Sequence, residues 1–135
     1  MSQENVEAFR RAVEANNRGD YDAVLEEVDS GIEWRAVFQV KFGGQATTCR
    51  GREAVRAYLE DLDEGFSVRR VEISEVRDLG ERVVATGHVR GRGRVSGAEI
   101  DSPIGFVIDF RNGKVFRMRD YLDSQEALEA AGLSG

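Results

Sequence analysis

Phe110-Arg-Asn-Gly-Lys-Val-Phe-Arg-Met-Arg-Asp-Tyr-Leu-Asp123 is the stretch that decides the fold. Asn112-Gly113 is the dipeptide most typical of a tight hairpin turn, and the flanking residues predict two antiparallel strands. Asp123, with Glu126 three residues later, has the spacing of a helix N-cap, and Gly132 is placed to end that helix. The C-terminal part of the chain is therefore predicted to be a hairpin followed by a short helix.

The rest of the chain divides into helices first and strands afterwards. Apolar residues recur at helical spacing in the N-terminal half, and from residue 68 onward they alternate with polar residues. Helices followed by an antiparallel meander predict an α+β fold with the helices on one face of the sheet. We expect helices within 2–19, 20–29 and 51–64, and strands over 32–38, 68–76, 82–95, 98–111 and 114–121.

The amino-acid composition excludes several classes of protein. The chain has 135 residues, of which 41% are hydrophobic and 33% charged, so we expect one globular domain over residues 1–135. Cys49 is its single cysteine and His88 its single histidine, which excludes a disulfide framework and a metal-ligand cluster. Neither an apolar signal segment nor a long apolar run is visible. We therefore expect a cytoplasmic protein that needs no cofactor, metal or membrane.

Arginines alternate along one predicted strand, which raises the question of nucleic-acid binding. The formal net charge of −6 argues against it. If Ser96-Gly97 forms a two-residue hairpin loop, Arg94 lies opposite Glu99 and Arg92 lies opposite Asp101. We interpret the arginines as part of the charged outer face of a hairpin, with no nucleic acid as partner.

Three glycines share the inner face of the same strand. Gly87, Gly91 and Gly93 stand where a packed sheet would normally carry Val or Ile, and glycine within a strand costs stability. They indicate either a bend in the sheet or space for a bulky ligand, and the sequence leaves both open. Gly87 is the one that we assign to the ligand.

The register of the last hairpin decides which side chains face the inside of the sheet. A two-residue loop would turn Arg117 and Arg119 inward. A bulged three-residue loop would instead turn Phe116, Met118 and Asp120 inward. Burying Phe and Met costs far less than burying two arginines, so we expect the bulged loop and an inward Asp120.

An inward Asp120 has two interpretations. A carboxyl group among apolar side chains has a raised pKa, which suits a general acid or base near neutral pH. In the alternative, Asp120 reaches the backbone of the following helix or an arginine at the rim, and its role is structural. The sequence favours neither.

Three short motifs and the order of the elements resemble one group of known proteins. The motifs are Asn17-Arg-Gly-Asp20, Gly51-Arg-Glu-Ala-Val55 and Arg111-Asn-Gly-Lys114. Over essentially the whole chain, the pattern resembles the SnoaL-like branch of the nuclear transport factor 2-like superfamily, which includes ketosteroid isomerase-like proteins. The resemblance implies a cone-like curved antiparallel sheet wrapped around three N-terminal helices, with a short C-terminal helix and an apolar cavity.

The resemblance also has implications for individual positions. A catalytic Asp of the limonene epoxide hydrolase branch lies in a stretch similar to Arg119-Asp-Tyr-Leu-Asp123, and it matches Asp120. The companion Arg and Asp of that branch match Gly87 and Val89, so two of its three catalytic groups are missing. The base and oxyanion donors of the ketosteroid isomerase branch fall at residues that cannot do that chemistry, namely Trp34, Ala12 and Phe106.

Two functions stay open. One is binding of a small apolar molecule in an enclosed cavity, with or without acid/base turnover of isomerase, cyclase or hydrolase type. The other is a non-catalytic dimeric domain with a filled or vestigial cavity, so the sequence does not decide whether the protein is an enzyme. Asp120 is the candidate catalytic residue. The candidate ligand-binding residues are Trp34, Tyr58, Phe106, Met118 and Gly87.

Two further expectations concern the surface of the molecule. Residues 39–50 carry two adjacent glycines and no hydrophobic period, so we expect a mobile loop that covers the cavity. The resemblance implies frequent dimerisation through the outer face of the sheet. We expect such a homodimer here, anchored by Val107, Val115 and Tyr121.

Overall fold

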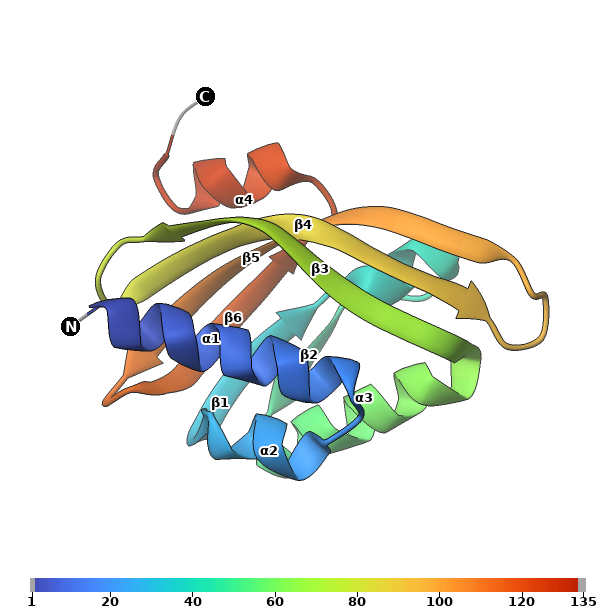
Figure 1. The fold of residues 1–135 in the computed structure, drawn as a ribbon, viewed down its shortest axis with the longest axis horizontal. Coiled ribbons are helices and arrows are strands. Elements are labelled where there is room, and N and C mark those ends of the chain that lie inside the picture. Colours follow the sequence, from blue (N-terminus) through green and yellow to red (C-terminus); the bar gives the residue numbers. More distant parts are fainter. Residues whose placement is uncertain (1, 134–135) are drawn as a thin grey trace.

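Figure 1 shows the computed structural model, which describes residues 2–133, as an α+β fold in which a curved sheet wraps around three helices and a fourth lies on its other face. The helices are α1 (Ser2–Asn17), α2 (Tyr21–Glu26), α3 (Arg52–Gly65) and α4 (Ser124–Ala130), with a short 3₁₀ helix η1 (Phe38–Phe42). The strands are β1 (Val28–Ala36), β2 (Thr47–Arg50), β3 (Phe66–Asp78), β4 (Arg82–Gly93), β5 (Glu99–Arg111) and β6 (Lys114–Tyr121). Asp123 caps α4 by accepting a hydrogen bond from the Gln125 N–H, as predicted.

The sheet has six strands within residues 2–133, in the order β2-β1-β6-β5-β4-β3. Neighbouring strands pair antiparallel except β1 and β6, which run parallel with Trp34 opposite Met118. The sheet is therefore mixed, whereas the sequence predicted an antiparallel one. A parallel pair is joined by a long crossover and not by a turn, so no local signal in the sequence reports it.

Residues 39–50 are more ordered than expected. Most of η1 lies in this segment, and Thr47–Arg50 form β2, which pairs with β1 at the edge of the sheet. The prediction of a loop over the whole of 39–50 was wrong. A four-residue edge strand is too short to display a hydrophobic period, so the sequence pattern could not predict it.

The hairpin between β4 and β5 has a longer turn than predicted. Arg92 lies opposite Glu99 and Arg90 opposite Asp101, so the register differs by two residues from the one expected. The Ser96 hydroxyl accepts a hydrogen bond from the Ala98 N–H at 3.1 Å and holds the wider loop. A shift of two residues leaves every side chain on its predicted face, and the arginines do pair with acids on the outer face.

The last hairpin places its bulge away from the turn. Asn112 and Gly113 both have positive φ, of 53° and 77°, which is the two-residue turn that twisted strands prefer. The register of β5 and β6 shifts beyond the turn, between Asp109 and Phe110 of β5. Met118 then pairs with Ile108 and Asp120 with Phe106. Asp120 faces inward as predicted, although the predicted three-residue loop was wrong. Phe116 is only half-buried.

Helix α4 covers part of the outer face of the sheet (Figure 1). Its Ala127 lies so close to Gly105 that a Cβ on that glycine would come within 2.5 Å of the Ala127 Cβ. On the same face, Val107 is fully buried within the single chain, and Val115 is buried on the opposite, inner face. Two of the three apolar anchors predicted for a dimer are therefore unavailable to a partner.

Candidate functional site

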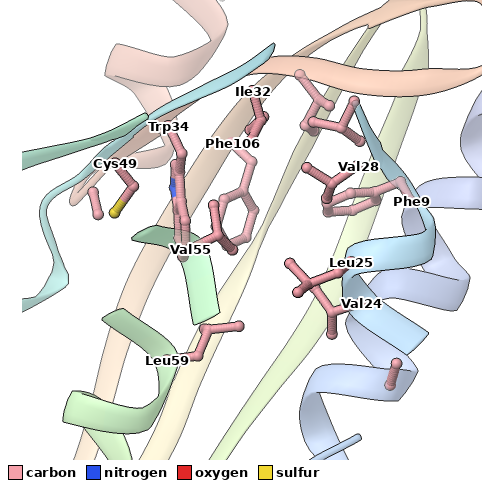
Figure 2. Close-up of a cluster of buried hydrophobic side chains, with 14 of the residues drawn as sticks. Phe9, Val24, Leu25, Val28, Ile32, Trp34, Cys49, Val55, Leu59 and Phe106 are labelled. Carbon is pink, nitrogen blue, oxygen red and sulfur yellow. The ribbon is translucent and has the colours of Figure 1, made fainter. Parts of the chain in front are cut away.

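A cavity of about 120 Å³ lies between the helices and the inner face of the sheet. Its walls are almost entirely apolar and come from α1, α2, α3 and five of the strands. Four predicted wall residues and the predicted catalytic residue line it, namely Trp34, Tyr58, Phe106, Met118 and Asp120. Figure 2 shows the indole of Trp34 between Cys49 on one side and Phe106 and Val55 on the other.

Asp120 is the acid of this cavity. Its side chain projects from β6 beneath the helices, and the residue is 3% exposed. The indole Nε1 of Trp34 donates a hydrogen bond to Asp120 Oδ1 at 2.8 Å. Burial raises the pKa of Asp120 to about 8, although the Trp34 hydrogen bond and the charge of Arg35 act in the opposite direction. At pH 7 the group is therefore mainly a neutral carboxylic acid.

The structural alternative predicted for Asp120 does not occur in the described chain. Helix α4 is capped by Asp123 and not by Asp120. Within residues 2–133, the hydrogen bond to the Asp120 side chain comes from Trp34, and no arginine at the rim forms an ion pair with it. One carboxyl oxygen is thus held by the indole, and the second is not hydrogen-bonded by the described residues.

Aromatic side chains hold this end of the cavity. The rings of Trp34 and Tyr58 meet edge to face, with centroids 4.9 Å apart. The Tyr58 hydroxyl donates to Gln39 Oε1 of η1 at 2.6 Å. Burial, followed by the charge of Asp120, raises the pKa of Tyr58. Tyr58 is therefore a neutral wall residue whose hydroxyl proton is already donated to Gln39.

Cys49 lies behind Trp34 and is buried (Figure 2). Burial raises the pKa of its thiol, and the nearby charge of Asp120 raises it further. A protonated thiol is a poor nucleophile. Cys49 therefore has a packing role, although it belongs to an edge strand and not to the loop that the sequence suggested.

Gly87 does not line the cavity, which corrects its assignment to the ligand. A Cβ at Gly87 would lie 2.0 Å from the carbonyl oxygen of Glu72 and 2.9 Å from the Cα of Ile73. The register of β3 shifts at this place, between Ile73 and Glu75. The glycine is required because the bulged backbone of the neighbouring strand approaches β4 closely. It leaves no room for a ligand.

Sequence reasoning missed a second polar group in the cavity wall. Arg69 of β3 lines the cavity together with Asn16 of α1, and its side chain is only 6% exposed. Its Nη2 donates to the Tyr21 hydroxyl at 3.1 Å and to Asp63 Oδ1 at 3.2 Å. The signal was present, because Arg69 lies two positions before Val71, a residue that packs against the core, and side chains two apart share one face of a strand.

Three aromatic rings pack together at η1, beside the cavity. Phe38 lines the cavity and contacts Phe42 and Phe66, with ring centroids 5.2 Å and 5.6 Å away. Phe42 is half-exposed because it lies on the outer side of this cluster. The first part of the segment that was predicted to be a mobile cover thus belongs to the short helix η1, which is held by Phe38 and by the Gln39 contact with Tyr58.

Residues 2–133 contain no group of three or more His, Cys, Asp or Glu side chains arranged to hold a metal ion. Across the same residues, no helix has both the length and the apolar character that crossing a membrane requires. The polar residues in the cavity wall are Asn16, Tyr58, Arg69 and Asp120, together with the indole N–H of Trp34.

Comparison with known proteins identifies the family. A family model described as a SnoaL-like domain matches residues 9–118. An NTF2-like protein of unknown function from Burkholderia pseudomallei is 25% identical, with a TM-score of 0.80 over 93% of this chain and 95% of that chain. An NTF2-like protein from Burkholderia xenovorans is 30% identical, with a TM-score of 0.69 over 97% of each chain.

TerC, crystallised with polyporic acid, is 22% identical, with a TM-score of 0.78 over 93% of this chain and 96% of that chain. At that identity the likeness shows the fold alone. No curated protein sequence matches this chain. The fold, the apolar cavity beneath the curved sheet and the match over residues 9–118 together show that the chain belongs to the SnoaL-like domain family.

Proposed function

We propose that the protein binds a small, largely apolar molecule in its cavity and transfers a proton to or from it through Asp120. The observation that carries the proposal is a buried, mainly neutral carboxyl group in the wall of an apolar cavity. A general acid or base works best when its pKa lies near the working pH. A pKa of about 8 lets Asp120 donate its proton to a carbonyl oxygen and, once ionised, withdraw one from an activated carbon.

The volume of the cavity limits the ligand. A dry cavity of about 150 Å³ holds benzene, and the cavity here is about 120 Å³. We infer a molecule of about one ring as the occupant of this conformation. A larger polyketide-like or steroid-like ligand would require the walls of the cavity to move apart.

A second candidate is binding without turnover. The Tyr58 hydroxyl donates to Gln39, so it is not free to stabilise negative charge that develops on a ligand oxygen. Acid/base enzymes usually add such a donor to the acid itself. This observation favours a non-catalytic binding domain, and the experiment below separates the two functions.

Binding is tested with the fluorescence of Trp34, the single tryptophan of the chain. Toluene and cyclohexanone serve as neutral one-ring probes, and each should change the emission with saturation. Ala12→Phe adds a ring from α1 into the cavity and should abolish the change, because Ala12 lines the cavity. Ala57→Phe places the same ring at an exposed position of α3 and should not.

Turnover is tested by deuterium exchange at the α-carbon of bound cyclohexanone, followed by NMR. The wild type should accelerate the exchange above the buffer rate, and Asp120→Asn should bind the ketone but lose the acceleration. Equal exchange by both proteins would remove Asp120 as the proton carrier. Binding by both without any acceleration would favour the non-catalytic candidate.

A further inference from the structure

Arg69 is a buried cation in the wall of the same cavity. Its side chain is only 6% exposed, and a guanidinium in such a place is costly unless its N–H groups are matched by acceptors. Tyr21 and Asp63 accept from Nη2, and Asn16 accepts from Nη1 at 3.4 Å. Nε is buried and has no hydrogen-bond partner among residues 2–133. One donor of the group is thus left for an acceptor that the described chain does not supply.

The charge around Arg69 is only partly balanced. Asp63 is the carboxylate paired with it, and the Asp63 side chain is 47% exposed. Asp63 also accepts a hydrogen bond from the Tyr21 hydroxyl. Burial and this hydrogen bond raise the pKa of Tyr21 to about 12, so Tyr21 stays neutral. A single, water-exposed and shared carboxylate leaves positive potential at the buried side of the guanidinium.

Arg69 and Asp120 mark two separate ends of the cavity. Their strands, β3 and β6, are separated by β4 and β5. They also differ in position along the strands, because Arg69 pairs with Gly91 of β4, whereas Asp120 pairs with Phe106, whose partner on β4 is Ala85. Both groups act on Tyr58: the charge of Asp120 raises the pKa of Tyr58, and the charge of Arg69 lowers it. One cavity therefore has a neutral acid at one end and a guanidinium at the other.

We propose that Arg69 binds an acidic oxygen of the ligand through its free Nε–H, so that the ligand is an apolar ring compound bearing a carboxylate, enolate or phenolate. This inference rests on the proposed binding function and specifies its ligand class. An anion is compatible with the opposite end of the cavity because Asp120 is mainly uncharged at pH 7. The oxygen held by Arg69 would orient the ring so that its other end faces Asp120.

The test compares benzoate with toluene, which share one ring and differ in the carboxylate. Both dissociation constants are measured at pH 7 by Trp34 fluorescence in the wild type, Arg69→Met and Arg70→Met. Arg70 is the neighbouring arginine of β3, is 63% exposed in its side chain and contacts only Glu72 among the described acids. Arg69→Met should weaken benzoate binding relative to toluene by at least about 10-fold, the size of one charge-assisted hydrogen bond. Arg70→Met should leave the ratio unchanged.

Toluene binding also reports whether the Arg69→Met cavity is intact. If that variant binds neither probe, Arg69→Lys decides the question, because an ammonium can hold Asp63 but lacks the fixed Nε–H of the guanidinium. Loss of the benzoate preference in Arg69→Lys, with toluene still bound, supports the proposal. An unchanged preference in either Arg69 variant overturns it and leaves the proposed function intact. Failure of the wild type to bind any of the probes overturns both.

Discussion

The Trp34 indole Nε1 and the Asp120 Oδ1 lie 2.8 Å apart, although 86 residues separate them in the chain. The parallel pairing of β1 with β6 brings them together, because Trp34 lies opposite Met118 and Asp120 follows two residues later on the same face. The sheet thus places Asp120 and its hydrogen-bond donor, Trp34, in the same wall of the cavity.

Asp120→Asn should stabilise the protein increasingly as the pH rises from about 4 to about 8. The unfolded chain releases the Asp120 proton near pH 4, whereas the folded chain keeps it up to about pH 8. Between these values the folded state binds the Asp120 proton more tightly, so the contribution of this group to the free energy of unfolding of the wild type falls as the pH rises. The contribution of this group is at most about 3 kcal/mol from pH 5 to pH 7.

Asparagine has no proton to lose and can still accept from Trp34, so its advantage over aspartate should grow across this interval. Urea unfolding of both proteins at pH 5, 6, 7 and 8 measures the difference. A difference that does not change with pH would show that Asp120 ionises normally in the folded protein.

Trp34→Phe should raise the pKa of Asp120 further. The indole N–H stabilises the charged carboxylate, and phenylalanine keeps an aromatic wall but removes the donor. Tyr58→Phe is the matched control, since it breaks the bond to Gln39 and does not touch the carboxyl group. Carboxyl ¹³C NMR titrations should give a higher midpoint for Trp34→Phe and an unchanged one for the control. A lower midpoint in Trp34→Phe would contradict the assigned role of the indole.

Gly87→Ala should destabilise the fold by at least about 2 kcal/mol, because its Cβ would overlap the carbonyl oxygen of Glu72. Gly65→Ala is the control, since a Cβ there meets no atom within 4 Å. Chemical denaturation should show a large loss for Gly87→Ala and no loss for Gly65→Ala. Equal stability of the two variants would restore the idea that Gly87 borders free space.

The homodimer remains a prediction, and the structure changes its expected chemistry. Val107 and Val115 are buried in the single chain, so an interface on the outer face would use the ion pairs of Arg90 and Arg92 with Asp101 and Glu99. Such charges are screened by salt. We expect sedimentation to give a dimer at about 0.05 M salt and a monomer at about 1 M. A monomer at both concentrations would contradict the prediction.

The sequence predicted those parts of the fold that depend on local chemistry. The Asn112-Gly113 turn and the Asp123 cap are set by a few adjacent residues, and both occur as expected. The inward direction of Asp120 followed from the cost of burying Arg117 and Arg119. That argument concerned the final environment of each side chain, so it held even though the bulge lies elsewhere.

Features that depend on distant segments could not be predicted in this way. The closeness of Gly87 to Glu72 arises from a bulge in the neighbouring strand, and the hydrogen bond from Trp34 to Asp120 requires a parallel pairing. Arg69 was missed for a different reason. Charged residues are usually exposed, and its partners Asn16 and Tyr21 come from α1 and α2, far from β3 in sequence.

The proton that Asp120 keeps at neutral pH inside the cavity can be observed by labelling the aspartate side chains with ¹³C. Their carboxyl resonances are followed from pH 3 to pH 10 in the wild type and in Asp120→Asn. One aspartate resonance should titrate near pH 8 in the wild type and should be missing from Asp120→Asn. Titration of every aspartate resonance below pH 5 would contradict this expectation.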